Sequence, residues 1–213
     1  MIKYIYPPRP MLFLREAIPT LNLSEYCVQL KLNDTRQIII YTPDKGVELF
    51  TRHNTPHKAY RPKKDTIEQF MALPFDKTKQ QIFDSLLMHS KNETVKDTWV
   101  LMDWLVKDGL YQLGTGFFKR DLQLDGLGTR QIEQGTGMRL AWEYSPNMWK
   151  SISYMGNMAV PLLDSYEKYW NENQLVEGVV LKSLDRPLRV HSAQGDCDWA
   201  FKVRYKKEGV YAF

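Results

Sequence analysis

Lysine, arginine and glutamate recur at the ends of apolar runs in four segments of the chain. A lysine attacks as a nucleophile only when it is neutral, and its reference pKa of ~10.4 falls when the side chain is buried or lies beside other cations. Cations grouped around a phosphate also stabilise the negative charge that develops on it during transfer. If they converge, the four segments provide a cation-rich site suited to a phosphate group: 31–36 (KLNDTR), 50–54 (FTRHN), 177–182 (EGVVLK) and 201–204 (FKVR).

Together the four segments resemble the covalent nucleotidyltransferase superfamily, which contains ATP-dependent DNA ligases, RNA ligases and mRNA capping enzymes. The segment 31–36 resembles motif I, Lys-x-Asp/Asn-Gly-x-Arg, although Asp34 stands where the family has glycine. Asp is one of the few residues that tolerate the positive φ of a tight turn. The segment 177–182 is the sharpest match and is similar to motif IV. The segment 50–54 resembles motif Ia, and 201–204 resembles motif V with Arg204 in place of a second lysine.

This resemblance assigns a role to each matched residue. It makes Lys31 the catalytic nucleophile that carries AMP, and it gives Lys182 and Lys202 contacts with the phosphate. It makes Glu177 the ligand of Mg²⁺ or Mn²⁺, which suits a hard carboxylate. Alternation along a strand puts positions 177 and 182 on opposite faces, so we expect Glu177 at the turn that enters the strand, with Gly178 freeing the backbone. The nucleotide-binding residues implied by the same resemblance are Gln29, Leu30, Asn33, Arg36, Arg52, Asp103, Phe118 and Arg204.

Three of these assignments rest on fainter similarity. The segment 100–105 (VLMDWL) resembles motif III, with Asp103 in place of glutamate and Met102 in place of glycine. The segment 121–126 (DLQLDG) resembles motif IIIa without its usual aromatic residue, and Phe117 or Phe118 would supply the ring that stacks on the base. Core packing is the stronger alternative for this region. Gln29 lies two residues before the motif I lysine, where its amide would contact the adenine edge.

A basic run follows Arg52 in the sequence. Such a run is usually a solvated loop, but its place directly after motif Ia indicates contact with a phosphate backbone. The residues concerned are Lys58, Arg61, Lys63 and Lys64. The histidines lack metal-ligand spacing, which argues against a zinc site.

The hydrophobic pattern predicts more strand than helix. Strands are expected at 27–31, 36–41 and 47–52 as an antiparallel meander, then at 99–106, 110–113, 176–182 and 199–205. Apolar residues at helical spacing predict two helices within 66–89, broken at Pro74, and one helix at 160–171. Without a regular βαβ alternation, this order predicts an α+β fold with antiparallel sheets and flanking helices in one domain, 1–213. The resemblance implies the ATP-grasp-like nucleotidyltransferase domain of ligases.

Composition sets the broad class of the protein. With 213 residues, 43% hydrophobic and 25% charged, the chain is long enough and apolar enough for a globular domain, and its net charge of +4 tolerates a polyanionic partner. Cys27 and Cys197 lie outside any CxxC pattern, which argues against a disulfide scaffold. No segment has the apolar length that spans a bilayer. We expect a monomeric cytoplasmic protein, in the host cytoplasm if it is phage-encoded, with no membrane partner.

The leading hypothesis is an ATP-dependent polynucleotide ligase that joins 5′-phosphate and 3′-hydroxyl ends of nucleic acid through a lysyl-AMP intermediate. Because the chain ends at Phe213, we expect no C-terminal OB-fold, as in minimal phage-type ligases, and a slight preference for RNA-containing ends. The alternatives are a minimal ATP-dependent DNA ligase, a GTP-using mRNA capping guanylyltransferase, and an inactive nucleic-acid-binding module of the same fold. Asp34, Met102 and Asp103 favour the inactive module.

Overall fold

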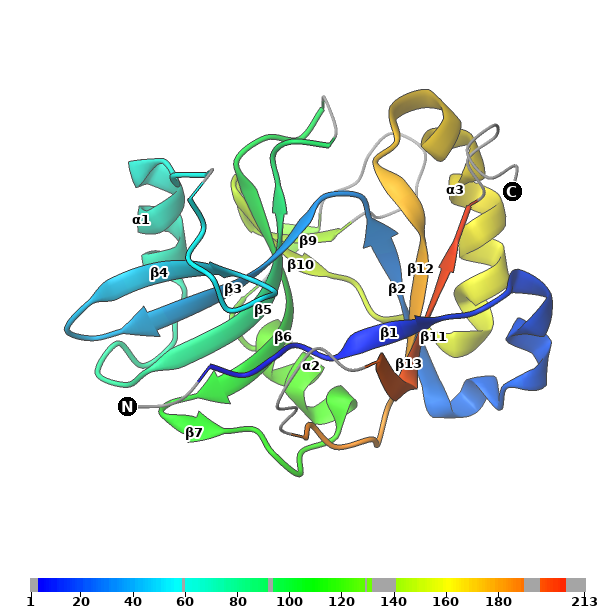
Figure 1. The fold of residues 1–213 in the computed structure, drawn as a ribbon, viewed down its shortest axis with the longest axis horizontal. Coiled ribbons are helices and arrows are strands. Elements are labelled where there is room, and N and C mark those ends of the chain that lie inside the picture. The colour runs from blue at the N-terminus through cyan, green and yellow to red at the C-terminus, as the bar shows by residue number, and fades with distance from the viewer. Residues whose placement is uncertain are drawn as a thin grey trace.

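Two β-sheets lie side by side in the computed structural model, which describes residues 4–58, 60–91, 94–128, 130–131, 141–189 and 196–205 (Figure 1). The first, sheet A, has the strand order β1-β13-β12-β2-β11. Its strands are β1 (Arg9–Leu12), β2 (Tyr26–Leu32), β11 (Tyr154–Met155), β12 (Val176–Ser183) and β13 (Asp196–Arg204).

The second sheet, sheet B, has the order β4-β3-β5-β6-β10-β9-β8, and β7 pairs with β6. Its strands are β3 (Thr35–Thr42), β4 (Gly46–Thr51), β5 (Gln81–Met88), β6 (Thr98–Lys107), β7 (Leu110–Tyr111), β8 (Arg130–Gln131), β9 (Ala141–Ser145) and β10 (Met148–Ser151). Three α-helices are described: α1 (Lys64–Ala72), α2 (Phe117–Asp125) and α3 (Ala159–Asn173). Short 3₁₀ helices occupy Arg15–Thr20, Leu23–Glu25 and Gly156–Met158. Within the described ranges no helix is long and apolar enough to cross a membrane.

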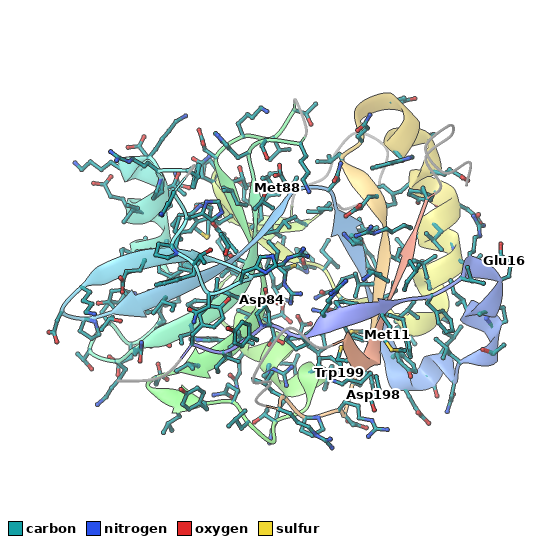
Figure 2. The ribbon with its side chains drawn as sticks, viewed as in Figure 1. Met11, Glu16, Asp84, Met88, Asp198 and Trp199 are labelled. Carbon is teal, nitrogen blue, oxygen red and sulfur yellow. The ribbon has the colours of Figure 1, made fainter. Side chains whose placement is uncertain are left out.

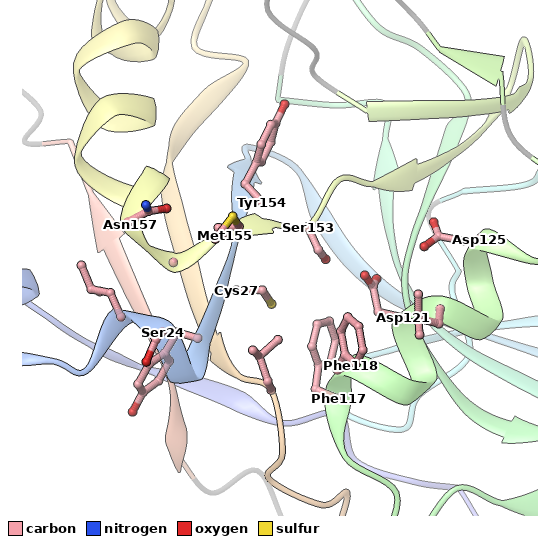
Figure 3. A pocket seen from close by; sticks show the side chains of 15 residues that line it. Ser24, Cys27, Phe117, Phe118, Asp121, Asp125, Ser153, Tyr154, Met155 and Asn157 are labelled. Atoms are coloured by element: carbon pink, nitrogen blue, oxygen red, sulfur yellow. The ribbon is translucent and has the colours of Figure 1, made fainter.

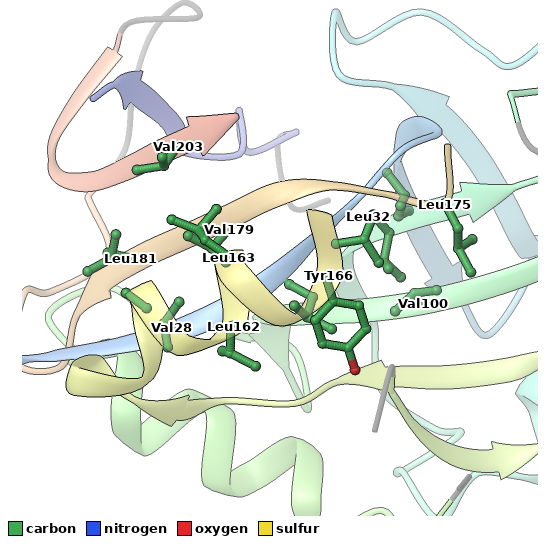
Figure 4. Close-up of a cluster of buried hydrophobic side chains, with 14 of the residues drawn as sticks. Val28, Leu32, Val100, Leu162, Leu163, Tyr166, Leu175, Val179, Leu181 and Val203 are labelled. Atoms are coloured by element: carbon green, nitrogen blue, oxygen red, sulfur yellow. The ribbon is translucent and has the colours of Figure 1, made fainter. Parts of the chain in front are cut away.

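One face of sheet A is apolar and packs against α3 (Figure 4). The helix presents Leu162, Leu163 and Tyr166 at helical spacing, which makes a continuous apolar stripe. Burying each such leucine is worth about 1.5–3 kcal/mol, so this packing fixes which way the sheet faces. The strand residues beneath the helix are Val28, Leu30, Leu32, Val179, Leu181, Phe201 and Val203.

Sheet B is buried on both of its faces. One apolar cluster contains Ile39, Phe83 and Trp104 together with Phe70 of α1, and the other contains Ile38 and Ile82 with Ile5 of the N-terminal segment. Every residue of β5 is buried as a result. A central strand of this kind is apolar nearly throughout, unlike a half-exposed strand that alternates.

The antiparallel α+β class predicted from the sequence is confirmed, but the predicted meander and the second of the two helices predicted within 66–89 are wrong. Residues 27–31, 36–41 and 47–52 do not form one meander, because β2 pairs with β12 and β11 whereas β3 pairs with β4 and β5. The second helix predicted within 66–89 is instead strand β5. Its residues 82, 83, 86 and 87 fit helical spacing, but the same spacing serves a strand that is apolar on both faces. The helix at 160–171 and the strands at 99–106, 176–182 and 199–205 are confirmed.

Gly178 sits in a β-bulge where the pairing of β12 with β2 shifts between Val176 and Gly178. Its φ is +143°, and a Cβ at this position would lie 2.0 Å from the carbonyl oxygen of Val203. Glu177 therefore lies within β12, not at the turn before it as the sequence predicted. The extra residue in the bulge lets Glu177 and Lys182 reach the same face despite their odd spacing.

We predict that Gly178→Ala lowers the free energy of unfolding by about 3 kcal/mol, because it combines a strained backbone with a backbone clash. Gly46→Ala is the matched control, since Gly46 also has a positive φ (+76°) but has open space around its Cβ position. The control should cost only about 1 kcal/mol. Urea denaturation of the two variants measures the difference, and equal losses would show that the bulge tolerates a side chain.

Candidate active site

The register of three adjacent strands brings the predicted site residues to one face of sheet A. Gly178 pairs with Lys31 on β2 and with Arg204 on β13. Val180 pairs with Gln29 and Lys202 in the same way. Directly paired residues of neighbouring strands share a face, and positions two apart along a strand do too. Lys31, Gln29, Lys182, Lys202 and Arg204 consequently line the face opposite the α3 core.

Lys31 and Glu177 form an ion pair at one end of this face, between Nζ and Oε1. The Nε of Arg204 lies 3.7 Å from Oε2 of the same carboxylate. Burial lowers the pKa of Lys31 to about 8; Glu177 opposes this shift, and the charges of Arg204 and Lys91 add to it. With such a pKa roughly a tenth of the amine is neutral at pH 7, far more than for an ordinary lysine, and a nucleophilic amine must be neutral.

Lys182 lies further along the same face, where its ammonium contacts β6 of sheet B and α2. Its Nζ lies 3.5 Å from the carbonyl oxygen of Met102 and 4.3 Å from the ring centre of Phe117. Burial lowers the pKa of Lys182, while the nearby carboxylates of Asp103 and Asp84 act against that shift. Lys202 Nζ donates to the carbonyl oxygen of Pro10 at 2.7 Å.

Two ion pairs that involve the buried carboxylates Asp84 and Asp103 of sheet B lie near Lys182. Arg36 on β3 donates from Nε to Asp84 at 2.8 Å and from Nη1 to the carbonyl oxygen of Pro8 at 2.7 Å. Asp84 lies near the centre of the molecule (Figure 2). Arg120 of α2 donates to both carboxylate oxygens of Asp103, at 2.8 and 2.9 Å. Burial raises the pKa of Asp103, but the Arg120 guanidinium outweighs it and holds the pKa below its usual range.

Asp84 and Arg120 are site residues that sequence reasoning missed. Asp84 pairs directly with Asp103 across β5 and β6, so the two carboxylates sit next to each other beneath Lys182. Asp84 is the lone carboxylate of β5 (QIFDSLLM), and Asp103 is the lone carboxylate of β6 (TWVLMDWLVK). A single carboxylate in a mostly apolar strand was the signal that the sequence offered. Because Arg120 occupies both oxygens of Asp103, the predicted nucleotide contact of Asp103 would require this pair to rearrange.

Of the other predicted nucleotide-binding residues, only some present their side chains on the face that carries Lys31. Gln29 is buried on the same face, and its Nε2 donates to Ser153 Oγ at 3.0 Å. The Leu30 side chain points to the opposite face, into the α3 core, so only its backbone is available to a ligand. Asn33 follows β2, and its backbone N–H donates to Leu175. Arg52 is exposed just beyond the end of β4.

Phe118 lines a cavity of about 390 Å³ (Figure 3). The cavity lies at the Cys27 end of β2, away from Lys31. Cys27, Phe117, Asp121 and Ser153 line it as well. Cys27 is four residues from Lys31 along β2, or roughly 13 Å. The cavity also adjoins Gln29, whose Nε2 donates to Ser153 of the cavity lining. Stacking of the base on Phe118 stays a prediction.

The predicted nucleic-acid-binding residues cluster before and at the start of α1. Lys58 and Arg61 are exposed. Lys63 Nζ lies 2.6 Å from Asp97, and Lys64 Nζ lies 3.3 Å from Glu68 one turn along the helix. The Lys64–Glu68 pair is exposed and contributes little to stability, so Lys64 can exchange its carboxylate partner for a phosphate. The partner of Lys63, Asp97, is buried, although Lys63 itself is exposed.

Glu177 is the carboxylate on the Lys31 face that fits a divalent cation. Among the described residues, no group of three or more His, Cys, Asp or Glu side chains is placed to hold a metal. A single carboxylate still suits Mg²⁺, which in phosphoryl-transfer sites commonly takes one or two carboxylates together with substrate phosphates and water.

Comparison with known proteins shows which fold this is. No family model and no curated sequence match the chain. Its structure is similar to that of a Lig E DNA ligase described as binding DNA with a minimal scaffold (TM-score 0.53, 17% identity, 96% of this chain and 70% of that one). It is similar to mycobacterial DNA ligase D complexed with ATP and MES (0.56, 17%, 93% and 60%) and to an archaeal ATP-dependent RNA ligase (0.51, 12%, 93% and 47%).

These structures share the ligase-type nucleotidyltransferase fold, so the fold predicted from the sequence resemblance is confirmed. At such low identities the likeness concerns the fold alone. The chain spans 70% of the Lig E protein and about half to three fifths of the other two.

We predict that Lys31 titrates well below an ordinary lysine, and that Glu177→Gln moves its pKa lower still. The carboxylate stabilises the ammonium form, so removing its charge favours the neutral amine and shifts the titration to lower pH. Competitive acylation across a pH series, read by mass spectrometry, measures this for each lysine against a free alkylamine of pKa ~10.4 in the same sample. A Lys31 profile that follows the free amine would contradict the burial argument.

Proposed function

We propose that the protein is an ATP-dependent polynucleotide ligase that works through a lysyl-AMP intermediate at Lys31. The observation that carries the proposal is the convergence of Lys31, Glu177, Lys182, Lys202 and Arg204 on one face of three paired strands. The shared fold with ATP-dependent DNA and RNA ligases, one of them solved with ATP, supports it.

In the first step the neutral Nζ of Lys31 attacks the α-phosphorus of ATP. A P–N bond forms, the bond to the pyrophosphate oxygen breaks, and Lys31 gives up one proton. Arg204 lies level with Lys31 in the sheet and Lys202 lies level with Gln29, and both would stabilise the charge on the phosphate oxygens. Lys182 pairs with Cys27 further along the same face, so its proposed contact with the phosphate requires its side chain to extend toward Lys31. Glu177 would hold Mg²⁺ or Mn²⁺, which supplies further charge neutralisation when it is bound.

In the second step a 5′-phosphate oxygen of the nucleic acid attacks the lysyl-AMP phosphorus, and the P–N bond breaks. This leaves AMP joined to the end through a pyrophosphate linkage. In the third step a 3′-hydroxyl attacks the 5′-phosphorus, loses its proton, and AMP departs as the new phosphodiester forms. Each step transfers a phosphoryl or nucleotidyl group, so the barrier is lowered mainly by positioning of the reactants and by fixed positive charge.

The basic residues Lys58, Arg61, Lys63 and Lys64 are proposed to contact the phosphate backbone of the substrate. Contacts of this kind are electrostatic and weaken steeply with salt. We further propose that the protein acts as a monomer on ends carrying a 5′-phosphate and a 3′-hydroxyl.

We predict that Lys31→Ala abolishes labelling by α-labelled ATP, because the variant lacks the amine that forms the P–N bond. Lys64→Ala is the matched control, since it removes an exposed lysine from α1 and should label normally. Autoradiography after denaturing electrophoresis gives the readout, with circular dichroism to check the fold. Labelling that persists in Lys31→Ala would place the nucleophile elsewhere.

The same assay separates the alternatives. Labelling by α-labelled GTP in preference to ATP would favour the capping guanylyltransferase. If the wild-type protein formed no adduct with either nucleotide in the presence of Mg²⁺ or Mn²⁺, it would be an inactive nucleic-acid-binding module.

We predict that RNA at the 3′-hydroxyl side of a break is sealed slightly faster than DNA. A ribose 2′-hydroxyl and A-form geometry offer a small domain recognition features that DNA lacks. Competition between nicked duplexes that differ only in the sugars flanking the break measures the preference. Equal or faster sealing of the all-DNA nick would instead make the protein a minimal ATP-dependent DNA ligase.

A further inference from the structure

Asp34 occupies the turn directly after the Lys31 strand and binds a second segment of chain. Its carboxylate accepts hydrogen bonds from the backbone N–H of His89 at 2.8 Å and from that of Lys91 at 3.2 Å. It also accepts one from the hydroxyl of Ser90 at 3.1 Å. Hydrogen bonds to a carboxylate are stronger than those between neutral groups, and Asp34 is only 8% exposed. The residues that follow β5 are therefore held against the turn at Lys31.

This contact brings the side chain of Lys91 back toward the nucleophile. Lys91 Nζ lies 3.4 Å from the backbone carbonyl oxygen of Asp34, three residues beyond Lys31. Lys91 itself is exposed, so its charge keeps much of its hydration. The Lys91 ammonium is thus held by geometry at the turn that follows the Lys31 strand.

We propose that Lys91 is a further phosphate-binding residue, which contacts the polyphosphate of the nucleotide that reacts at Lys31, and that Asp34 is its positioning residue. The inference rests on the proposed function. Arg204, on β13, lies beside Glu177, the partner of Lys31, and Lys91, after β5, contacts the turn that follows Lys31, so the two cations come from different elements. Once the α-phosphorus is at Lys31, the β- and γ-phosphates extend a few ångströms from it, within reach of an exposed flexible lysine anchored at Asp34.

The proposal also accounts for the substitution in motif I. Glycine at position 34 would satisfy the turn but could not accept hydrogen bonds from residues 89–91. The positive φ expected at position 34 from the sequence is not found, because Asp34 is not among the described non-glycine residues with positive φ. The turn therefore does not need glycine, and the Asp34 carboxylate determines where Lys91 lies. A phosphate of the nucleic acid is the other source of the same chemistry, and the experiment separates the two.

We predict that Lys91→Ala raises the ATP concentration needed for half-maximal lysyl-AMP formation by about tenfold or more. This is the effect expected for loss of a charged hydrogen bond. Lys91→Arg should retain most of the activity, because it keeps the charge. Asp34→Asn should act in the same direction but less strongly, since the amide keeps one acceptor oxygen and loses the charge. Lys96→Ala is the matched control: Lys96 donates to the His89 carbonyl oxygen at 2.9 Å in the same connection, and its loss should leave ATP dependence unchanged.

Two further measurements identify which phosphate Lys91 binds. Pyrophosphate-driven reversal of purified lysyl-AMP should weaken in Lys91→Ala to a similar degree, because it requires the same anion. Sealing of a pre-adenylylated end, which bypasses ATP, should remain unchanged in this variant.

The possible outcomes distinguish a failure of the Lys91 proposal from a failure of the proposed ligase function. If the wild-type protein forms no lysyl-AMP, the proposed function fails and the inference fails with it. If the wild-type protein labels and Lys91→Ala shows the same ATP dependence, the inference alone is overturned. If Lys91→Ala loses sealing of pre-adenylylated ends as strongly as adenylylation, Lys91 serves the nucleic acid or the fold, and the inference is again overturned.

Discussion

The antiparallel pairing of β12 with β2 on one side and β13 on the other is the constraint on which the site depends. Lys31, Lys182 and Lys202 come from three strands that are far apart in the sequence, and no contact among the side chains themselves would bring like charges together. The apolar face of the same strands packs against α3, which fixes the opposite face as polar. The hydrophobic core thus supplies the free energy that holds the cations in one place.

Placing several cations on one face of sheet A, next to sheet B, costs free energy. Nearby carboxylates offset this cost, but to different degrees for Lys182 and Lys31. Lys182 has the carboxylates of Asp84 and Asp103 close by, but Arg36 and Arg120 already occupy those carboxylates. Lys31 has Glu177 as its partner, and Arg204 competes for the same carboxylate. Among the described residues of the polar face, the cations Lys31, Lys182, Lys202 and Arg204 outnumber the carboxylate Glu177, and an anion bound there would offset this difference. Binding of a phosphate would therefore lower the electrostatic repulsion among the cations on this face.

The sequence predicted the strands that carry charged residues better than it predicted how the chain passes between sheets. Lys31, Glu177, Lys182 and Lys202 interrupt apolar runs, and such interruptions are visible without a structure. Nothing local showed that the short turn at 33–34 changes sheets instead of closing a hairpin, a path fixed partly by the Asn33 N–H donating to Leu175. Strand β5 was mistaken for helix because both periodicities fit its apolar residues. Asp84 was missed together with that strand. Arg120 was missed because its partner Asp103 lies 17 residues away in the sequence, on a different element.

The departures from the family motifs bear on whether the site is active. Asp34 and Asp103 favoured an inactive module when only the sequence was considered, because a decayed site accumulates substitutions that serve no purpose. In the structure both carboxylates are buried and both are bound: Asp34 holds the segment before Lys91, and Asp103 holds Arg120 through two hydrogen bonds. A buried carboxylate without partners would destabilise the fold, whereas one that organises the surroundings of Lys31 or Lys182 is consistent with selection on the site. These two substitutions therefore no longer count as evidence for loss of function, which leaves the adenylylation assay to decide between the alternatives.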